Sequence, residues 1–515
     1  MRVDQMVAAV AASSDGAART ALAPEDGCRI SYLELAQRID AAAPALAQQG
    51  LGAGQRAVLV GENSVDMVVL LLAVTRLRAW AVPLNARMSP AEIDAICAHA
   101  EPALVYCASR SSTEAAEHAR RLGAVRAEAA PLADGLVAVR AGEGTCSDGS
   151  GESSSDSGSP DEVALMIYTS GSTGTPKGVM LTHANLDFVT RASLAQQVLL
   201  PGDAVFHALP ISHSFGLISA LLCGLRAGAT LHLMTRFSAE KLAHAILHDG
   251  ITVFQGVPAM YARLHEWADH NGQSLTPNHL RMAYIGGSQI DPARKAQAES
   301  LLGLRLHHGY GLTESAPAAS RTIGHPAPTD VSAGWPIPGI EVVLRDAQGR
   351  ELPTGEQGEV CIRGANVMKG YFRDPAATRA AIDADGWLHT GDVGVFRPAG
   401  DLLIVGRSKE MIIRGGFNVY PAEVENAIAA YPDVAQCAVV GRTRDGDEEI
   451  VAYIEPQAGR TVDVDGLKAF LRRRLAPYKQ PSQIVCVARL PATTTGKLLK
   501  AQIKALAAAD LMGST

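Results

Sequence analysis

The stretch MIYTSGSTGTPKGVMLTH, from Met166 to His183, gives the first indication of the fold. Apolar residues from Val163 to Tyr168 predict a strand, the polar segment from Thr169 to Gly178 predicts a loop, and apolar character returns at Val179. Glycines let backbone amides converge, and hydroxyls and a lysine add donors, so a loop of this composition can hold an anion such as a phosphate. The expected donors are Thr169, Ser170, Gly171, Ser172, Thr173, Gly174 and Lys177.

This loop differs from the common P-loop, in which Gly and four further residues precede Gly-Lys-Ser/Thr. The chain has no Gly-Lys-Ser/Thr tripeptide, since Gly496-Lys497 is followed by Leu498. The sequence therefore predicts a phosphate site of another type.

Composition limits the possible classes of function. The 515 residues exceed one ordinary core and predict two or more domains, which the 47% hydrophobic residues can fill. A net charge of −7 without a basic stripe argues against nucleic acid and favours small-molecule partners. The apolar run from Met67 to Val74 is shorter than the roughly 20 residues that a membrane span requires.

The N-terminus has no sustained apolar core, so we expect no signal peptide and a cytoplasmic location. The eight cysteines, scattered from Cys28 to Cys486, form no Cys-x-x-Cys pair. This spacing predicts reduced packing residues and neither a zinc motif nor a disulfide framework. The oligomeric state is left open, and an oligomer is compatible with the sequence.

Helix and strand signals alternate along most of the chain and predict layered α/β structure. Capping boxes precede helices at Ser31 and Ser89, and the first of these helices carries Leu33, Leu35, Ile39 and Leu46. Further helices are expected at 239–248 and from Asp291-Pro292. The expected strands are 57–60, 103–107, 205–209, 230–233, 251–254, 282–285 and 304–307.

The polar stretch from Ala141 to Pro160 predicts a solvated linker. Beyond about Gly334, short strands and turns predict a smaller β-rich subdomain. The last part of the chain mixes expected helices at 422–429 and 466–475 with strands at 437–440, 450–454 and 484–487. The sequence thus predicts an α/β fold, with a large multi-layer α/β N-terminal domain that includes the β-rich subdomain, and a small α+β C-terminal domain.

Four later motifs carry residues suited to chemistry. In HHGYGLTES, from His307 to Ser315, Tyr310 can stack on a flat base and Glu314 is an oxygen ligand suited to Mg²⁺. In GWLHTGDVG, Asp392 can accept hydrogen bonds from both hydroxyls of a ribose. The other two motifs are VGRSKEMIIRGGFNVYPAEVE, from Val405, and LPATTTGKLLK, which contains Lys497. Taken singly, each can also be a surface turn or a solvated charge, and for the HHGYGLTES loop and for Lys497 this interpretation would be favoured.

In order, TSGSTGTPKG, GYGLTE, TGD, GRSKEMIIRGG and a terminal TGK resemble the motifs of the adenylate-forming superfamily, and in particular its acyl- and aryl-CoA synthetases. The resemblance spans Met166 to Lys500, and PISHSFGL, from Pro210, is similar to the segment that borders the acyl pocket, with His213 at a position often occupied by histidine. It implies an acid–thiol ligase that uses ATP and Mg²⁺ to form an acyl adenylate from a carboxylic acid, releases pyrophosphate, and passes the acyl group to CoA.

The resemblance also implies roles for individual residues. The loop from Thr169 to Gly178 would handle the departing phosphates, with Thr169 and Glu314 at the metal. Lys497 would bridge the carboxylate and the α-phosphate. The implied nucleotide contacts are Gly286, Gly287, Ser288, His308, Gly309, Tyr310, Gly311, Thr313, Asp392 and Arg407.

A domain rotation is implied for the second step, with an ATP- and acyl-binding domain over residues 1–406, a hinge at 407–409 that includes Lys409, and a mobile domain over 410–515. The loop at Gly415, Gly416 and Phe417 would then line a tunnel for CoA.

Two alternatives stay open. A related enzyme could load a carrier protein, although SHSFG lacks the aspartate that amino-acid adenylation domains use to hold the substrate's amino group. A non-catalytic nucleotide-binding module could use the same loop and Asp392, but it would not need Lys409, Lys497 and a Gly-Gly loop together. The carboxylic acid itself is not determined, because small apolar differences between pockets discriminate only about 10–200-fold.

Overall fold

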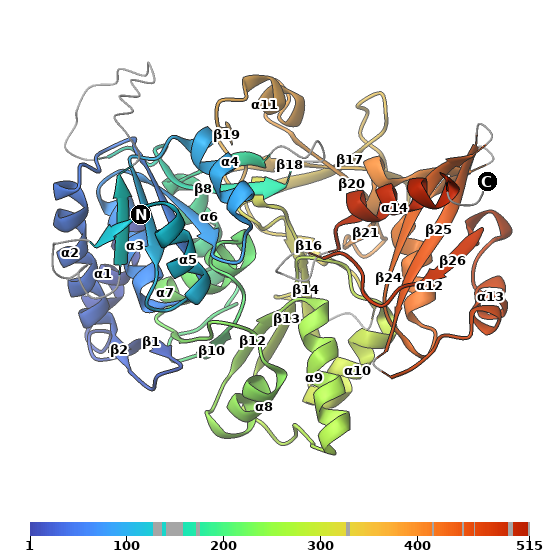
Figure 1. The fold of residues 1–515 in the computed structure, drawn as a ribbon, viewed down its shortest axis with the longest axis horizontal. Coiled ribbons are helices and arrows are strands. Elements are labelled where there is room, and N and C mark those ends of the chain that lie inside the picture. Colours follow the sequence, from blue (N-terminus) through green and yellow to red (C-terminus); the bar gives the residue numbers. More distant parts are fainter. Residues whose placement is uncertain are drawn as a thin grey trace.

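The computed structural model describes residues 1–126, 136–140, 158–170, 176–325, 330–414, 417–444, 447–457, 459–492 and 498–512 (Figure 1). The predicted linker from Ala141 to Pro160 lies outside these ranges except for its last three residues.

A mixed eight-stranded sheet carries the motif at Met166. Its central strands are parallel, whereas β9, β19, β6 and β7 run antiparallel to their neighbours. In spatial order the strands are β19 (Gly370–Tyr371), β9 (Pro176–Thr182), β8 (Val163–Ser170), β4 (Trp80–Asn85), β3 (Arg56–Gly61), β5 (Leu104–Ala108), β7 (Leu136–Arg140) and β6 (Val125–Arg126).

A nine-stranded sheet forms the second layer and is parallel except for β2, β15 and β16. Its order is β16 (Trp335–Pro336), β15 (Ser320–Arg321), β14 (Leu306–Tyr310), β13 (Met282–Ile285), β12 (Val253–Gly256), β10 (Ala204–His207), β11 (Thr230–Leu233), β1 (Thr20–Pro24) and β2 (Ile30–Ser31).

The predicted β-rich subdomain is a four-stranded antiparallel sheet of β17 (Ile340–Arg345), β18 (Gln357–Gly364), β20 (Leu388–Phe396) and β21 (Leu402–Arg407). After it come the pair β22 (Ile412–Arg414) and β23 (Phe417–Val419), and the sheet β24 (Val434–Arg444), β25 (Asp447–Pro456) and β26 (Gln483–Cys486). This last part of the chain stands beside the rest of the protein, coloured orange to red in Figure 1.

Helices cover these sheets, and several begin with the predicted caps. Ser31 and Ser89 each accept a hydrogen bond from the backbone amide three residues later, as a capping side chain should. The helices are α1 (Met6–Ala11), α2 (Tyr32–Gln48), α3 (Val65–Arg76), α4 (Pro90–Ala100), α5 (Thr113–Arg121), α6 (His183–Ala195), α7 (Cys223–Ala227), α8 (Ala239–His248), α9 (Pro258–Asn271), α10 (Pro292–Leu302), α11 (Pro375–Ala381), α12 (Pro421–Ala429), α13 (Val464–Arg472) and α14 (Lys500–Met512).

The largest hydrophobic core joins both large sheets. It contains residues of strands from each of them, together with the buried faces of α2, α3 and α6. Helix α3 is buried without interruption from Met67 to Thr75, which explains the apolar run noted in the sequence. Among the described residues, no helix is both long and apolar enough to cross a membrane.

Several predicted boundaries were wrong. The loop at Thr169–Gly178 is shorter than expected, because β8 and β9 form an antiparallel hairpin in which Thr169 pairs with Lys177 and Ser170 with Pro176. Backbone hydrogen bonds do not depend on side-chain polarity, so polar residues extend both strands. Strands β12 and β14 end two and three residues later than predicted, β24 is longer, and Leu33 is 47% exposed on α2.

A π-helix, η2 (Phe215–Leu222), crosses the large core directly after His213 and Ser214. Its second residue is Gly216, where an added Cβ would lie 2.3 Å from the Pro210 carbonyl oxygen and 2.8 Å from that of Leu209. Backbone oxygens cannot yield as a flexible side chain can, so only glycine fits here.

We therefore expect Gly216→Ala to destabilise the protein by about 1–3 kcal/mol, as overpacking of a core does. The measurement is the apparent thermal and urea midpoint of unfolding. Gly52→Ala is the matched control, because its Cβ would meet its nearest neighbour, Gln55 Oε1, at 3.7 Å. Equal midpoints for the two variants would contradict the packing argument.

Two buried polar side chains lie side by side in the nine-stranded sheet. His207 and Gln255 follow the paired residues Phe206 and Phe254 on the adjacent parallel strands β10 and β12. In the described part of the chain, neither ring nitrogen of His207 and neither amide atom of Gln255 has a hydrogen-bond partner. Burial lowers the pKa of His207 to about 4, so the ring is neutral in the folded protein.

Because the pKa of His207 is lower in the folded than in the unfolded chain, its contribution to stability is complete above about pH 6.5 and is lost as the pH falls toward 4. We expect His207→Leu to reduce the loss of stability between these pH values, measured as urea midpoints. His270→Leu, at an exposed position of α9, is the control. An unchanged pH profile in His207→Leu would refute the assignment.

Candidate active site

Two of the predicted motifs, GYGLTE and TGD, meet where β14 of the nine-stranded sheet approaches β20 of the four-stranded sheet (Figure 1). Two side-chain hydrogen bonds join β14 and the segment after it to other sheets. The Tyr310 hydroxyl on β14 donates to Asp392 Oδ2 on β20 at 2.7 Å. The Tyr371 hydroxyl on β19 donates to Glu314 Oε1, beyond β14, at 2.8 Å.

A bulge in β20 presents Asp392. On β18, Glu359 and Cys361 pair with Val393 and His389, so two residue steps on β18 face four on β20. The bulged turn requires a positive φ of 71° at Gly391, which glycine adopts without strain.

Side chains and backbone of β18 hold this bulge in place. Glu359 Oε1 accepts a hydrogen bond from the Gly391 amide at 2.9 Å, and the Thr390 hydroxyl donates to the Val360 carbonyl at 2.8 Å. The Asp392 amide in turn donates to the Thr390 hydroxyl at 3.1 Å. The direction of Asp392 is therefore set by its neighbours before any ligand binds.

Asp392 is only 5% exposed, and each of its carboxylate oxygens accepts a hydrogen bond, Oδ2 from Tyr310 and Oδ1 from Arg407. Arg407, at the end of β21, donates from Nε to Oδ1 at 2.8 Å. Burial, followed by the adjacent Asp392 charge, raises the pKa of Tyr310 well above its usual value. The phenol therefore stays protonated and remains a hydrogen-bond donor at neutral pH.

Glu314 lies in a short 3₁₀ turn (Thr313–Ser315) that follows β14. Besides the bond from Tyr371, its backbone carbonyl accepts a hydrogen bond from the Met368 amide at 2.9 Å. The ammonium group of Lys177 lies 4.9 Å from the centre of the Tyr371 ring. Tyr371 thus connects the lysine of the β8–β9 hairpin with the carboxylate of Glu314.

Close packing explains the glycines of the GYG motif. An added Cβ would lie 1.8 Å from the Tyr284 hydroxyl at Gly309 and 2.1 Å from the Pro317 carbonyl oxygen at Gly311. The neighbouring His308 is buried, with Nδ1 3.1 Å from the Ser332 carbonyl oxygen, and burial lowers its pKa to about 4. These three residues support the site through packing with the chain itself.

The segment after β10 lies against the same site. The Ser214 and Thr313 hydroxyls are 3.0 Å apart, and His213 Nδ1 accepts a hydrogen bond from the Phe215 amide at 3.3 Å. The Phe215 ring lies close to Gly286, whose added Cβ would be 3.2 Å from it. Gly287 and Ser288, which follow β13, are exposed.

Some predicted site residues fall outside the described ranges, namely Gly171, Ser172, Thr173, Gly174, Gly415, Gly416 and Lys497. Ser170 and Lys409 are described only through their backbone, in β8 and in the 3₁₀ turn Ser408–Glu410. Lys500, three residues after Lys497, forms ion pairs with Glu410 at 2.7 Å and Glu425 at 3.0 Å.

Sequence reasoning missed Tyr371, Glu359 and Thr390. Tyr371 belongs to the sequence MKGYF, whose Gly-Tyr pair resembles any turn followed by an aromatic residue. Glu359 lies among the alternating residues of a strand, with no local sign that its carboxylate accepts from a backbone amide 32 residues away. Only the pairing of β18 with β20 reveals that role.

Comparison with known proteins identifies the family. Residues 9–372 match the AMP-binding enzyme family, and residues 423–497 match the AMP-binding enzyme C-terminal domain. Feruloyl-CoA synthase from Amycolatopsis sp. is 36% identical over 481 residues, covering 93% of this chain and 94% of that protein. The chain belongs to the AMP-binding enzymes and, within them, to the acyl- and aryl-CoA synthetase branch of the adenylate-forming superfamily.

Solved structures agree. ATP-bound MatB from Rhodopseudomonas palustris is 30% identical, with a TM-score of 0.84 and coverage of 98% of this chain and 99% of that one. The apo form of MatB, at 29% identity and the same coverage, gives a TM-score of only 0.74. O-succinylbenzoate CoA synthetase from Bacillus subtilis, in complex with ATP and magnesium ion, is 28% identical with a TM-score of 0.81, covering 97% and 99%. The overall conformation of this chain is therefore closer to that of the ATP-bound form of MatB than to that of the apo form.

The contact between Tyr371 and Glu314 leads to a prediction. Tyr371→Phe keeps the aromatic ring beside Lys177 but removes the bond to the carboxylate, and a hydrogen bond to a charged group contributes about 1.5–3 kcal/mol. We expect kcat/KM for ATP to fall by about 10-fold or more while the melting temperature changes little.

Tyr32→Phe is the matched control, because its buried hydroxyl donates to the Ala229 carbonyl at 2.8 Å in the large core, away from Glu314. It should lower stability without lowering kcat/KM for ATP. Unchanged kinetics in Tyr371→Phe would remove Tyr371 from the site.

Proposed function

We propose that the protein is an ATP-dependent carboxylate–CoA ligase whose nucleotide site is built from Glu314, Tyr310, Asp392 and Arg407. The observation that carries this proposal is the hydrogen bond by which Tyr310, four residues before Glu314, reaches Asp392 of another sheet, where Asp392 also accepts from Arg407. Membership of the CoA synthetase branch supports it, and so does the similarity to feruloyl-CoA synthase along nearly the whole chain.

The reaction has two steps because a carboxylate is a poor electrophile. In the first step a carboxylate oxygen attacks the α-phosphorus of ATP, the bond to the bridging oxygen breaks, and pyrophosphate leaves. In the second step the CoA thiol attacks the acyl carbonyl, its proton is lost, and AMP leaves. Phosphoryl chemistry of this kind depends mainly on positioning and on charge neutralisation.

The residues divide this work by position. Asp392 and Arg407 would bind the ribose, and Tyr310 with the segment Gly286-Gly287-Ser288 would bracket the adenine. Lys177, with the rest of the β8–β9 turn, would accompany the departing pyrophosphate. Lys497 would neutralise charge between the carboxylate and the α-phosphate, where it accumulates in the transition state. His213 would border the acyl group.

Magnesium fits the carboxylate of Glu314. One of its oxygens accepts from Tyr371, and no hydrogen bond from the described residues reaches the other. Hard oxygen ligands of this kind suit Mg²⁺ bound together with substrate phosphates, and Thr169 of β8 would be the second ligand. The ion would supply positive charge to the phosphates.

The substrate class is an aryl-substituted carboxylic acid, as the name of the feruloyl-CoA synthase suggests. A pyrophosphate-release assay with aromatic, fatty and branched acids tests this, and ferulic acid should give the highest kcat/KM. CoA should be the acceptor in preference to a carrier protein, as the names of the related CoA synthetases suggest, and the absence of an aspartate from SHSFG argues against an amino-acid substrate. If none of the acids in the panel stimulated the release of pyrophosphate, the proposed function itself would be overturned. We retain the prediction of a cytoplasmic enzyme.

Lys497→Ala separates the two steps. Because Lys497 would act only while the adenylate forms, we expect loss of acid-dependent ATP–pyrophosphate exchange. Transfer to CoA from supplied acyl adenylate should stay within a few-fold of the wild type. Equal loss of both half-reactions would contradict this assignment.

A complementary variant tests the domain boundary, for which we propose a large domain at 1–406, a hinge at 407–409 and a mobile domain at 410–515. Proline fixes φ where rotation is needed, so Lys409→Pro should spare adenylation and block thioester formation. A Lys409→Pro enzyme with both steps intact would exclude Lys409 as the hinge. Loss of adenylation alone in Lys497→Ala, together with loss of thioester formation alone in Lys409→Pro, would support a rotation of the small domain between the two steps.

A further inference from the structure

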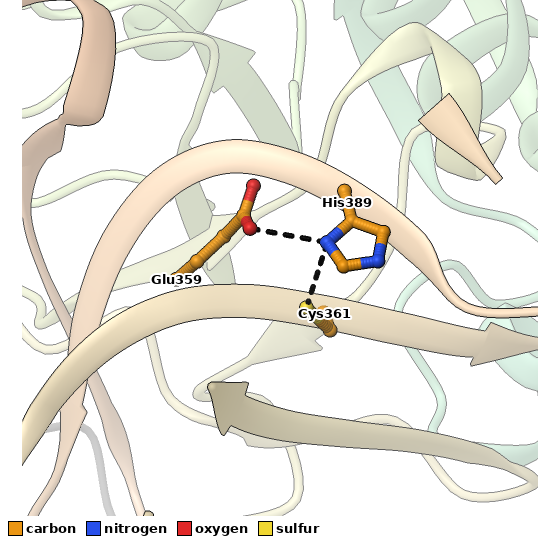
Figure 2. Close-up of side chains that lie close together, drawn as sticks. All are labelled: Glu359, Cys361 and His389. Atoms are coloured by element: carbon orange, nitrogen blue, oxygen red, sulfur yellow. Dashed lines mark hydrogen bonds and ion pairs between the residues drawn. The ribbon is translucent and has the colours of Figure 1, made fainter. Parts of the chain in front are cut away.

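A cluster of three different potential metal ligands lies in the four-stranded sheet, beside the bulge that carries Asp392. Cys361 on β18 and His389 on β20 are directly paired across the two strands, and Glu359 is two residues before Cys361 on the same face. Figure 2 shows the three side chains converging, with the imidazole between the sulfur and the carboxylate. One ligand atom from each lies within 4.8 Å of the other two.

The two separations that involve His389 are close to those around a tetrahedral ion. His389 Nδ1 is 3.6 Å from Cys361 Sγ and 3.1 Å from Glu359 Oε2. Zinc bound at about 2.3 Å to sulfur and about 2.0–2.1 Å to nitrogen and oxygen would place sulfur and nitrogen about 3.6 Å apart, and nitrogen and oxygen about 3.3 Å apart. Both observed separations are thus near the values that a bound ion would impose.

Further contacts orient two of the ligands. Asp383 Oδ2 lies 3.4 Å from the other ring nitrogen of His389, Nε2, and is itself paired with Arg345 at 3.0 Å. The second oxygen of Glu359 accepts from the Gly391 amide. A carboxylate on the far nitrogen of a metal-bound histidine is a common supporting contact, because it fixes the ring orientation and raises its basicity.

Charge and access are also suitable. With Cys361 as a thiolate, it and the side chains of Glu359, Asp383 and Arg345 together carry a net charge of about −2. A divalent cation would neutralise this charge. The sulfur is buried, but the side chains of His389 and Glu359 are 30% and 31% exposed. An ion could therefore enter from the solvent side, where a water molecule could complete its coordination.

We propose that Glu359, Cys361 and His389 bind a divalent cation of intermediate softness, namely Zn²⁺, at a site separate from the proposed magnesium position at Glu314. One sulfur, one nitrogen and one oxygen ligand favour such an ion over Mg²⁺ or Ca²⁺, which take oxygen ligands. The site has no Cys-x-x-Cys spacing, because its ligands come from two paired strands 28 residues apart at Cys361 and His389.

The test uses the full-length enzyme in a Cys28→Ser/Cys146→Ser/Cys486→Ser background, which removes the two exposed thiols of the described residues and the one cysteine that lies outside them. After treatment with a chelator, the protein is titrated with Cd²⁺, whose bond to a thiolate gives an ultraviolet charge-transfer band. We expect the band to saturate at one equivalent and to be displaced by Zn²⁺. Absence of the band, or saturation only at several equivalents, would overturn the proposal.

Single substitutions assign the ligands. Cys361→Ser should abolish the band, whereas Cys107→Ser, at another buried free cysteine in a strand, should leave it intact. His389→Asn and Glu359→Gln, at more exposed positions, should each prevent saturation at one equivalent and thus serve as tests even if Cys361→Ser does not fold. Asp383→Asn should weaken binding by about 10-fold or more through loss of the supporting contact. A band that survives in folded Cys361→Ser would refute the site.

Discussion

The carboxylate of Asp392 is the point on which the geometry of the site depends. It accepts one hydrogen bond from Tyr310 of the nine-stranded sheet and another from Arg407, the last residue of the four-stranded sheet. A nearly buried carboxylate is costly unless it is paired, so both donors are required. The same contacts join the two sheets and hold this carboxylate beside Arg407, where the chain leaves the four-stranded sheet for its last part.

Hydrogen bonds from a side chain to backbone carbonyls join that last part to the rest of the protein, and such bonds can be replaced by others when a domain moves. Arg294 on α10 donates to the backbone carbonyls of Val434 and Ala435 on β24. The core of the last part is built from its own residues, such as Ile412, Val424 and Ile450. Such an arrangement is consistent with the proposed rotation, because the small domain would move with its core intact.

Sequence reasoning predicted most of the helices and strands and the family. Helix α8 and strands β11 and β13 were predicted to the residue, because capping residues and apolar periodicity are local signals. The hairpin of β8 and β9, the bulge in β20 and the role of Tyr371 were missed. The bulge and the contact of Tyr371 depend on partners distant in sequence, whereas the hairpin was missed because polar residues extend its strands.

The sequence by itself determined the family and the chemical groups available, because the spacing of TSGSTGTPKG, GYGLTE and TGD is a property of short segments. Only the tertiary structure decided that Glu314 is held by Tyr371, that Asp392 is held by Tyr310 and Arg407, and that Cys361 faces His389. The reason is physical. Strand register and the packing of sheet edges bring together side chains whose positions in the chain are unrelated, and they do so through backbone hydrogen bonds that carry little trace in the sequence.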